Sequence, residues 1–415
     1  MTNEVKNVPK LRFQRFEDEW KKKRLKDIVE PLKGNSGENK NLPVLTISAK
    51  KGWLNQKERF SQVIAGNSLS KYNELKKGDL SYNKGNSKVA LYGIVYKLGF
   101  DNALVPNVYK SFRPKPNNVS DFLEKYFHTK ILDRQLRRVI TSTARMDGLL
   151  NISDYDFYNM SLNIPVNNEQ KKIGDFFSKL DQQIELEEQK LEKLEEQKKG
   201  YMQIIFLQQL RFKDENGNDY PEWRKIELGN LGTTFTGLSG KTKEDFGHGN
   251  AKFITYMNVF KNTIAELEMT KKVDVKDNER QSKVEYKDIL FTTSSETPNE
   301  AGMSSIWLYK SENMYLNSFC FGFKVNYKDI EPIYLTRYLR SENMRKKITV
   351  LSQGSTRFNI SKREMMKLTI NFPVIEEQTK IVKFLDIAER RIGEQNKKLE
   401  QLKHRKKGFL QKMFV

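Results

Sequence analysis

Two long segments of the chain carry hydrophobic residues at alternating spacings of three and four, which is the pattern of a heptad repeat. These segments, 168–206 and 376–415, contain no proline and are rich in Glu, Gln, Lys and Leu. A seam sustained over roughly four to five heptads predicts a coiled coil. The seam residues are Leu180, Ile184, Glu187, Leu191, Leu194 and Lys198 in the first segment, and Ile392, Gln395, Leu399, Leu402, Lys406 and Phe409 in the second.

The polar positions of the seam predict how the two helices pair. A parallel pair would set Lys198 against Lys406, which is repulsive. An antiparallel pair can align Glu187 with Lys406 and Lys198 with Gln395, and it then sets leucine on leucine along the rest of the seam. We therefore expect an antiparallel coiled coil in this register. The alternative is that each helix packs separately on its own domain.

The regions outside these helices alternate short apolar runs with Gly, Asn and Pro, which is typical of β-rich structure. Strands are expected near 43–47, 89–96, 253–257 and 319–325, and helices at 121–138 and 331–347. Residues 79–84 align with 288–293 as matching strands. Each region is expected to be an α+β domain with a twisted mixed or antiparallel sheet.

The chain is an internal duplication. Asn-Ile-Ser at 151–153 recurs at 359–361, and the same offset of 208 carries Pro-Val at 165–166 and Glu-Gln at 169–170 onto 373–374 and 377–378. About 21 of 56 positions from 151 to 206 are identical at this offset, without a gap. A lead of Leu-Arg-Phe that closes with Glu-Trp stands at both 11–20 and 210–223.

The duplication divides the chain into two globular regions, 1–167 and 207–375, each followed by a long helix, 168–206 and 376–415. The first long helix is followed directly by the second lead. By the same relation, the end of the second helix, at Phe414, is expected to lie next to the first lead at Leu11. The chain is therefore expected to be nearly circular, with pseudo-two-fold symmetry between the two halves.

The charge of the chain points to a polyanionic partner. There are 74 Lys and Arg against 53 Asp and Glu, a net charge of +21, and residues 1–167 alone carry 30 basic and 17 acidic residues, or +13. Nucleic acid is the first candidate and an anionic membrane surface the second. The membrane surface fits poorly, because neither long helix sets a basic face opposite a wide apolar one.

Loops and helices that combine basic, hydroxyl and amide side chains are the candidate DNA contacts, because such groups bind phosphates and the edges of bases. They recur at matched places in the two halves. In the first half they are Tyr82, Asn83, Lys84, Asn86, Ser87, Lys88, Arg134, Arg137, Arg138 and Arg145. In the second half they are Thr292, Thr293, Ser294, Ser295, Arg345, Lys346, Lys347 and Arg357.

Motifs for catalysis are missing. Residues 237–242 resemble a phosphate loop, but Phe235 stands where the motif requires Gly. The chain has no Pro-Pro pair for an adenine methyltransferase and no acidic cluster at nuclease spacing. One Cys and three His exclude a disulfide framework and a Cys-rich zinc site. Cys320 lies between two phenylalanines and is therefore predicted to be a core residue. No catalytic residue and no metal site is predicted.

Duplicated globular regions with matched long helices and the Pro-Val-x-x-Glu-Gln signature resemble the specificity subunit of type I restriction-modification systems, over the full chain. The resemblance implies two target recognition domains that each read half of a split double-stranded DNA site, with the coiled coil setting the gap. It implies one such chain per complex, with two methyltransferase and two restriction subunits. S-adenosylmethionine, ATP and Mg²⁺ are then expected on these partners, and no cofactor on this chain.

Two other classes stay open from the sequence. One is a self-contained methyltransferase or nuclease, which the missing motifs disfavour. The other is a scaffold that binds any duplex without preference for sequence. The N-terminus has no signal peptide and no run of apolar residues is long enough to span a membrane, so a soluble protein of the bacterial cytoplasm, associated with the nucleoid, is expected.

Overall fold

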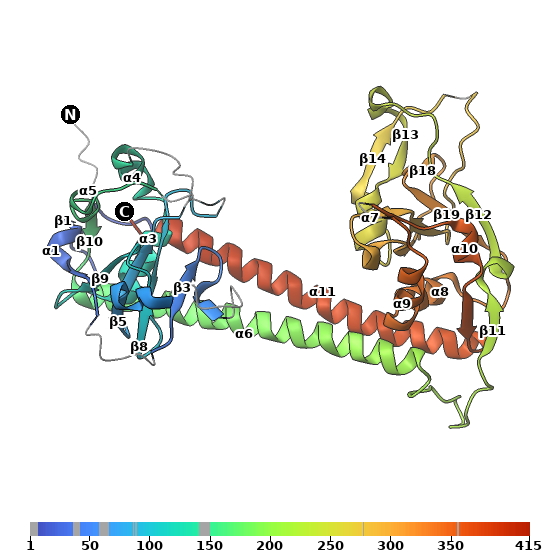
Figure 1. Ribbon diagram of the computed structural model, residues 1–415, viewed down its shortest axis with the longest axis horizontal. Helices are drawn as coiled ribbons and strands as arrows, with labels where there is room; N and C mark the ends of the chain where they lie inside the picture. Colours follow the sequence, from blue (N-terminus) through green and yellow to red (C-terminus); the bar gives the residue numbers. More distant parts are fainter. Residues whose placement is uncertain are drawn as a thin grey trace. The chain divides into compact units, whose positions relative to one another are not determined.

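The computed structural model describes residues 7–35, 42–57, 66–85, 87, 89–140, 150–276, 278–354 and 357–415. It divides into two compact units: the first unit comprises residues 1–189 and 396–415, and the second unit comprises 190–395. The long helices α6 (Asn167–Phe206) and α11 (Ile375–Lys412) each contribute residues to both units (Figure 1). Their bounds lie within three residues of the predicted segments.

The first unit is built on a four-stranded antiparallel sheet in the order β2-β9-β6-β7. The strands are β2 (Val29–Leu32), β9 (Lys110–Pro114), β6 (Leu80–Asn83) and β7 (Ile94–Lys97). The unit also contains three separate two-stranded ladders. They pair β1 (Lys21–Arg24) with β10 (Ser161–Ile164), β3 (Leu45–Ser48) with β4 (Gly52–Asn55), and β5 (Asn73–Lys76) with β8 (Asn102–Val105). Its shorter helices are α1 (Leu25–Ile28), α3 (Ser120–His128), α4 (Asp133–Val139) and α5 (Asp154–Tyr158), with a 3-10 turn at Gly66–Lys71.

The second unit repeats this plan. Its four-stranded sheet has the order β12-β19-β15-β17, formed by β12 (Gly232–Thr236), β19 (Cys320–Val325), β15 (Ile289–Thr292) and β17 (Ser304–Ile306). A three-stranded sheet combines β14 (Thr270–Val273), β13 (Phe246–Ile254) and β18 (Met314–Leu316), with β13 and β18 parallel. Two ladders pair β11 (Arg224–Glu227) with β21 (Thr369–Phe372) and β16 (Ser294–Ser295) with β20 (Phe358–Asn359).

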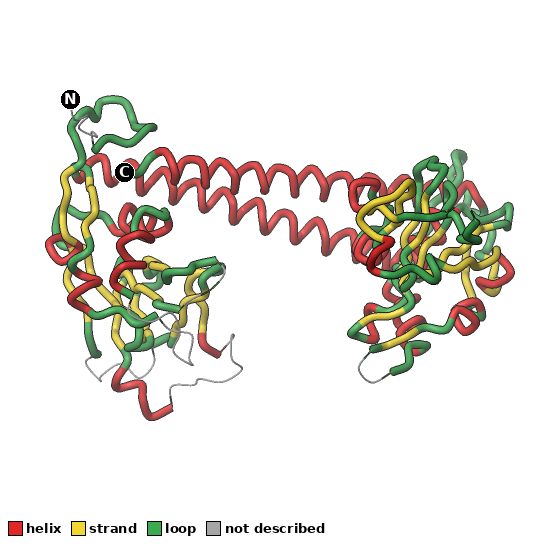
Figure 2. Tube along the Cα trace, turned by 90° about the horizontal axis from the view of Figure 1, so that it is seen from above, coloured by secondary structure: helices red, strands yellow, loops and turns green. Residues whose placement is uncertain are grey.

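The helices of the second unit also follow those of the first. They are α7 (Tyr256–Lys261), α8 (Pro332–Leu339), α9 (Glu342–Val350) and α10 (Lys362–Met366), with 3-10 turns at Leu228–Leu231, Lys243–Asp245, Leu267–Met269 and Pro298–Glu300. Helices are red and strands yellow in Figure 2, where both globular regions mix the two. The predicted α+β class with a mixed or antiparallel sheet is therefore confirmed in each unit.

Several details of the sequence-based prediction differ from the structure. The expected helix 121–138 is broken into α3 and α4, because the Thr129 hydroxyl bonds the Tyr126 carbonyl and turns the chain to an extended conformation. The expected helix 331–347 is broken at Ser341 into α8 and α9. The expected strand at 253–257 ends at Ile254, and Thr255 caps α7 by accepting from the Asn258 amide.

Each unit has its own aromatic core, which includes the end of one long helix. In the first unit Phe414, just past the end of α11, packs on Trp20, Phe122 and Tyr126, and the Leu11 amide donates to the Lys412 carbonyl at 2.9 Å. In the second unit Phe206 of α6 packs on Tyr334 and Tyr338. The C-terminus therefore meets the first lead, as the near-circular plan predicts.

Candidate nucleic-acid interface

Two predicted segments of the second region, 292–297 and 353–357, meet through the β16–β20 ladder. Ser294 lies opposite Asn359, and Ser295 lies opposite Phe358. Gln353 and Asn359 exchange both backbone hydrogen bonds, at 3.0 and 2.8 Å. Residues far apart in the sequence thus form one surface feature.

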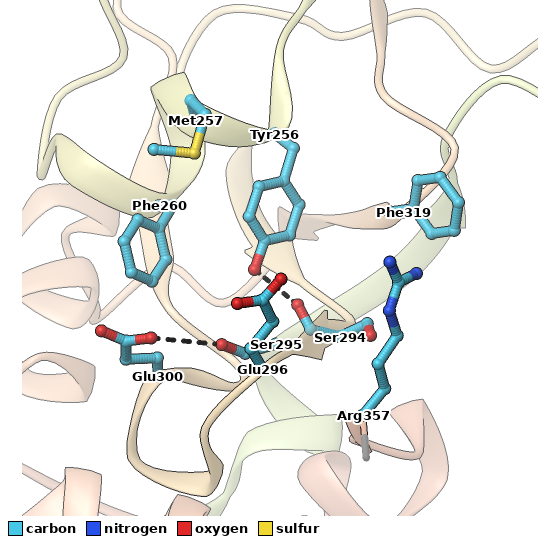
Figure 3. Close-up of a pocket in the computed structure, with 9 residues that line it drawn as sticks. All are labelled: Tyr256, Met257, Phe260, Ser294, Ser295, Glu296, Glu300, Phe319 and Arg357. Carbon is cyan, nitrogen blue, oxygen red and sulfur yellow. Dashed lines mark hydrogen bonds between the residues drawn. The ribbon is translucent and has the colours of Figure 1, made fainter. Parts of the chain in front are cut away.

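A cavity of about 420 Å³ opens beside this ladder (Figure 3). Tyr256, Phe260 and Phe319 supply aromatic surface, and the Tyr256 and Phe260 rings stack at 6.0 Å and 14°. The Tyr256 hydroxyl donates to the Ser294 carbonyl, which ties α7 to β16. Glu296 and Arg357 bring one negative and one positive side chain to the same cavity.

The loop that carries Arg357 depends on glycine. Gly354 has φ +139°, a conformation that favours glycine. A Cβ at this position would lie 1.9 Å from the Arg357 carbonyl oxygen, which is far inside any real contact distance. Gly354 therefore fixes the backbone from which Arg357 projects.

The first unit has a more basic cavity of similar size, also about 420 Å³. Its amines come from Lys33, Lys71, Lys84 and Lys110, and its carboxylate is Asp154. Hydrogen bonds from Lys110 at 2.5 Å and Lys33 at 2.8 Å lower the pKa of Asp154 to about 2. Lysines outnumber the carboxylate, so the cavity suits a phosphate. Sequence reasoning missed Lys33, Lys71 and Lys110, because they lie in three separate segments without a shared motif.

Two candidate DNA contacts are buried and a third binds backbone carbonyls, so the structure corrects the prediction for these three. Tyr82 is 1% exposed and its hydroxyl donates to the Tyr92 carbonyl. Thr292 is fully buried, and its hydroxyl accepts from the Met303 amide. The Arg345 guanidinium donates to three backbone carbonyls, those of Asn299, Ala301 and Gly302. These side chains hold the core and the loops, so we remove them from the candidate interface.

Other candidates hydrogen-bond to nearby backbone groups. The Asn83 amide donates to the Ile47 carbonyl and accepts from the Gly85 amide, while the Ser87 hydroxyl accepts from the Ala90 amide. The Lys84 backbone carbonyl accepts a hydrogen bond from the Leu150 amide at 2.8 Å. The Thr293 hydroxyl donates to the Phe319 carbonyl.

The remaining candidates stay predictions. Those with exposed side chains on described helices are Arg134, Arg137 and Arg138 on α4, and Lys346 and Lys347 on α9. Lys346 pairs with Glu342 one turn away, at 3.1 Å. Asn86, Lys88 and Arg145 lie outside the described residues.

The long helices pair antiparallel within each unit, but the predicted register is wrong. In the first unit Lys406 bonds Asp181 at 2.5 Å, and in the second unit Lys198 bonds Glu389 at 2.7 Å. Each of these carboxylates lies six residues before the predicted partner, Glu187 or Gln395, and Glu187 itself pairs with Lys398. The true register is therefore shifted by about one heptad. Aromatic pairs mark it in both units: Phe176 with Phe409, and Tyr201 with Phe384.

The repeated sequence signatures attach each long helix to its domain. Arg12 of the first lead donates to both oxygens of Glu169, at 2.7 and 2.8 Å, and Arg211 repeats this contact on Glu377 at 3.2 and 2.6 Å. The side chain of the adjacent Gln170 donates to the Pro165 carbonyl. The signatures thus have a structural role, since these carboxylates are buried.

The described residues contain no group of three or more His, Cys, Asp or Glu placed to hold a metal ion. In the loop that resembles a phosphate loop, the Lys241 amine is held by Glu279 at 2.6 Å. Cys320 is buried in the core, and burial raises the pKa of its thiol. None of the described helices combines the length and the apolar composition that a membrane span requires.

A family model described as "Type I restriction modification DNA specificity domain" matches residues 17–196 and 220–404. The chain is 24% identical over 429 residues to a "Putative type I restriction enzyme MjaX specificity subunit" of Methanocaldococcus jannaschii, covering 97% of this chain and 95% of that protein.

Two solved structures share the fold. One is a "Type-I restriction-modification system S subunit from M. genitalium", with a TM-score of 0.57, 15% identity, and coverage of 98% of this chain and 99% of that one. The other is a chain from a structure of "complex assembly" and "conformational transition of the type I R-M system", with a TM-score of 0.58, 14% identity, and coverage of 97% and 99%.

Proposed function

The chain belongs to the type I restriction modification DNA specificity family, and from this premise we propose that each of its units reads one half of a bipartite double-stranded DNA site. The paired helices α6 and α11 set the gap between the half-sites. The chain is the recognition subunit and does no chemistry itself. Because the surface loops of the two units differ, the site is asymmetric.

One observation carries the proposal: the two units keep the same framework while side chains at equivalent positions differ. Asp154 and Lys362 stand at equivalent positions, each directly after the repeated Asn-Ile-Ser. Asp154 is held by two lysines, whereas the Lys362 amine lies 5.9 Å from the centre of the Phe321 ring. A conserved scaffold with divergent surfaces is what two readers of different sequences require.

The partners follow from the role of a specificity subunit. We propose that one copy of this chain docks two methyltransferase subunits and two restriction subunits. The methyltransferase subunits would bring S-adenosylmethionine for adenine methylation, and the restriction subunits would use ATP and Mg²⁺ for cleavage. The net charge of +21 favours this role, because it attracts the phosphates of DNA electrostatically.

The test is to express the chain with its methyltransferase subunit and to map the modified adenines in the host genome. A gapped, asymmetric motif is expected. Exchanging residues 21–150 for those of a relative should change one half of the motif and leave the other half and the gap intact. Methylation without a defined motif would instead favour a scaffold without sequence preference. Methylation by the purified chain alone would show a self-contained enzyme.

A further inference from the structure

Two charged residues stand at the same end of the β16–β20 ladder. Ser294 faces Asn359 and Ser295 faces Phe358, so Glu296 directly follows β16 and Arg357 directly precedes β20. Both side chains line the cavity of the second unit.

Both charges lack a partner among the residues that the structure describes. Neither Glu296 nor Arg357 forms a hydrogen bond or an ion pair with any residue that the structure describes, and they do not pair with each other. In Figure 3 the Glu296 carboxylate points toward the Tyr256 hydroxyl, while the Arg357 guanidinium points toward the Phe319 ring. An acceptor and a forked donor thus line the same cavity.

We propose that this pair reads a G·C base pair in the major groove, an inference that rests on the proposed DNA-reading function. Arg357 donates to the adjacent O6 and N7 acceptors of guanine, and Glu296 accepts from the N4 amino group of the paired cytosine. The major groove admits a two-stranded β-ribbon, which is what β16 and β20 form. The aromatic rings supply apolar surface around these polar contacts.

Other ligands match the pair less well. A phosphate would suit Arg357 but would be repelled by Glu296 and by Glu300 in the same cavity. An A·T pair offers Glu296 the N6 amino group of adenine, but it offers Arg357 no two adjacent acceptors on one base. A G·C pair uses both the donor fork and the carboxylate.

The experiment uses the chain in complex with its methyltransferase subunit. The motif is mapped first, and binding is then measured on duplexes that carry each of the four base pairs at every specified position of the half-site assigned to the second unit. Arg357→Ala and Glu296→Gln should each abolish discrimination at one and the same G·C position, by about 10- to 100-fold for the arginine variant. Replacing that guanine by 7-deazaguanine, which lacks N7, should weaken the unaltered complex and leave Arg357→Ala unaffected.

The matched control is Lys328→Ala, which removes an exposed positive charge of the same unit outside the cavity. It should leave the preference at the G·C position unchanged. Variants that bind all four base pairs more weakly by the same factor, or that change no position of this half-site, would overturn the proposal. Such a result would leave the proposed function intact, because that function fails only if no half-site depends on the second unit.

Discussion

Lys125 of α3 donates to Asp181 of α6 across 2.8 Å, and Asp181 also accepts from Lys406 of α11 at 2.5 Å. All three residues belong to the first unit. Lys125 is only 7% exposed. Burial opposes its charge, but Glu124 and Asp181 outweigh burial and keep the pKa of Lys125 above its usual value. A buried cation of the globular region is thereby bonded to both long helices through a single carboxylate.

The second unit repeats this arrangement with different residues. Arg337 of α8 donates to Glu389 of α11 at 2.8 Å, and Glu389 also accepts from Lys198 of α6 at 2.7 Å. The duplication has kept the order cation, carboxylate, cation while exchanging Lys for Arg and Asp for Glu. Preservation of the geometry through both exchanges indicates that this contact fixes each globular region on the helix pair.

Replacing Arg337 by Met should lower the free energy of unfolding by about 1.5–3 kcal/mol, because it removes hydrogen bonds to charged groups. The Arg337 side chain is 1% exposed, and its removal leaves Glu389 and Asp386 without their shared buried cation. Arg337→Lys should cost less, because it keeps a charge there. Urea unfolding followed by tryptophan fluorescence measures the difference. Lys328→Ala, at an exposed position, serves as the control, and equal effects of Arg337→Met and Lys328→Ala would argue against an anchoring role.

Acid should weaken the same contacts. Burial opposes ionisation of Asp181, but Lys125 and Lys406 outweigh it and hold the pKa of Asp181 below its usual value. A lowered folded-state pKa contributes stability that is present above the unfolded pKa of about 4 and is lost as the pH falls through the lower folded value. Stability should therefore drop below about pH 4. Asp181→Asn should be less stable at pH 7 and should show a shallower acid dependence of the unfolding free energy. An unchanged slope would contradict this assignment.

How far the sequence could lead is clearest at the long helices. The gapless repeat at an offset of 208 and the absence of proline predicted the bounds of α6 and α11 closely. The seam could not fix their register, because a pattern that repeats every seven residues packs leucine on leucine almost as well after a shift of seven. Contacts outside the seam select the true register, and the buried Lys125 and Arg337 lie in globular helices that no heptad analysis includes.

The candidate site, too, could be predicted from the sequence only in part. Loops rich in Ser, Thr and Arg were identified from composition, and two of them do meet at the cavity of the second unit. Composition could not distinguish Arg345, which binds backbone carbonyls, from Arg357, which is exposed. Strand pairing decides this difference, since β16 and β20 come together from distant parts of the chain.

Two matched glycines of the long helices offer a stabilising change. Gly200 and Gly408 occupy equivalent helical positions, and a Cβ at either would meet no atom within 4 Å. Alanine at each should raise the free energy of unfolding by about 0.5–1 kcal/mol, because it reduces the freedom of the unfolded chain and favours the helix. Gly174→Ala is the contrasting variant, since its Cβ would lie 2.8 Å from the Asp121 Cβ, and it should destabilise the protein. Thermal unfolding of the three variants tests the expected signs.

Shortening both long helices by one heptad tests their role in setting the gap. Segments 183–189 and 397–403 both lie in the first unit and contain both members of two ion pairs, Glu187 with Lys398 and Glu188 with Lys403. Removing the two segments together preserves the heptad phase and spares Asp181 and Lys406. The helix pair becomes shorter by about 10 Å, which corresponds to about three base pairs of duplex.

The mapped methylation motif should therefore keep both half-sites and lose about three base pairs from the gap. Removing segment 183–189 alone should instead unfold or inactivate the complex, because Lys398 and Lys403 then lose their partners and the two helices no longer match in length. Circular dichroism of the double deletion confirms that its helices are retained. A folded double deletion that still methylates the original gap would show that the spacing is set elsewhere, while altered half-sites would show that the helices also position the reading surfaces.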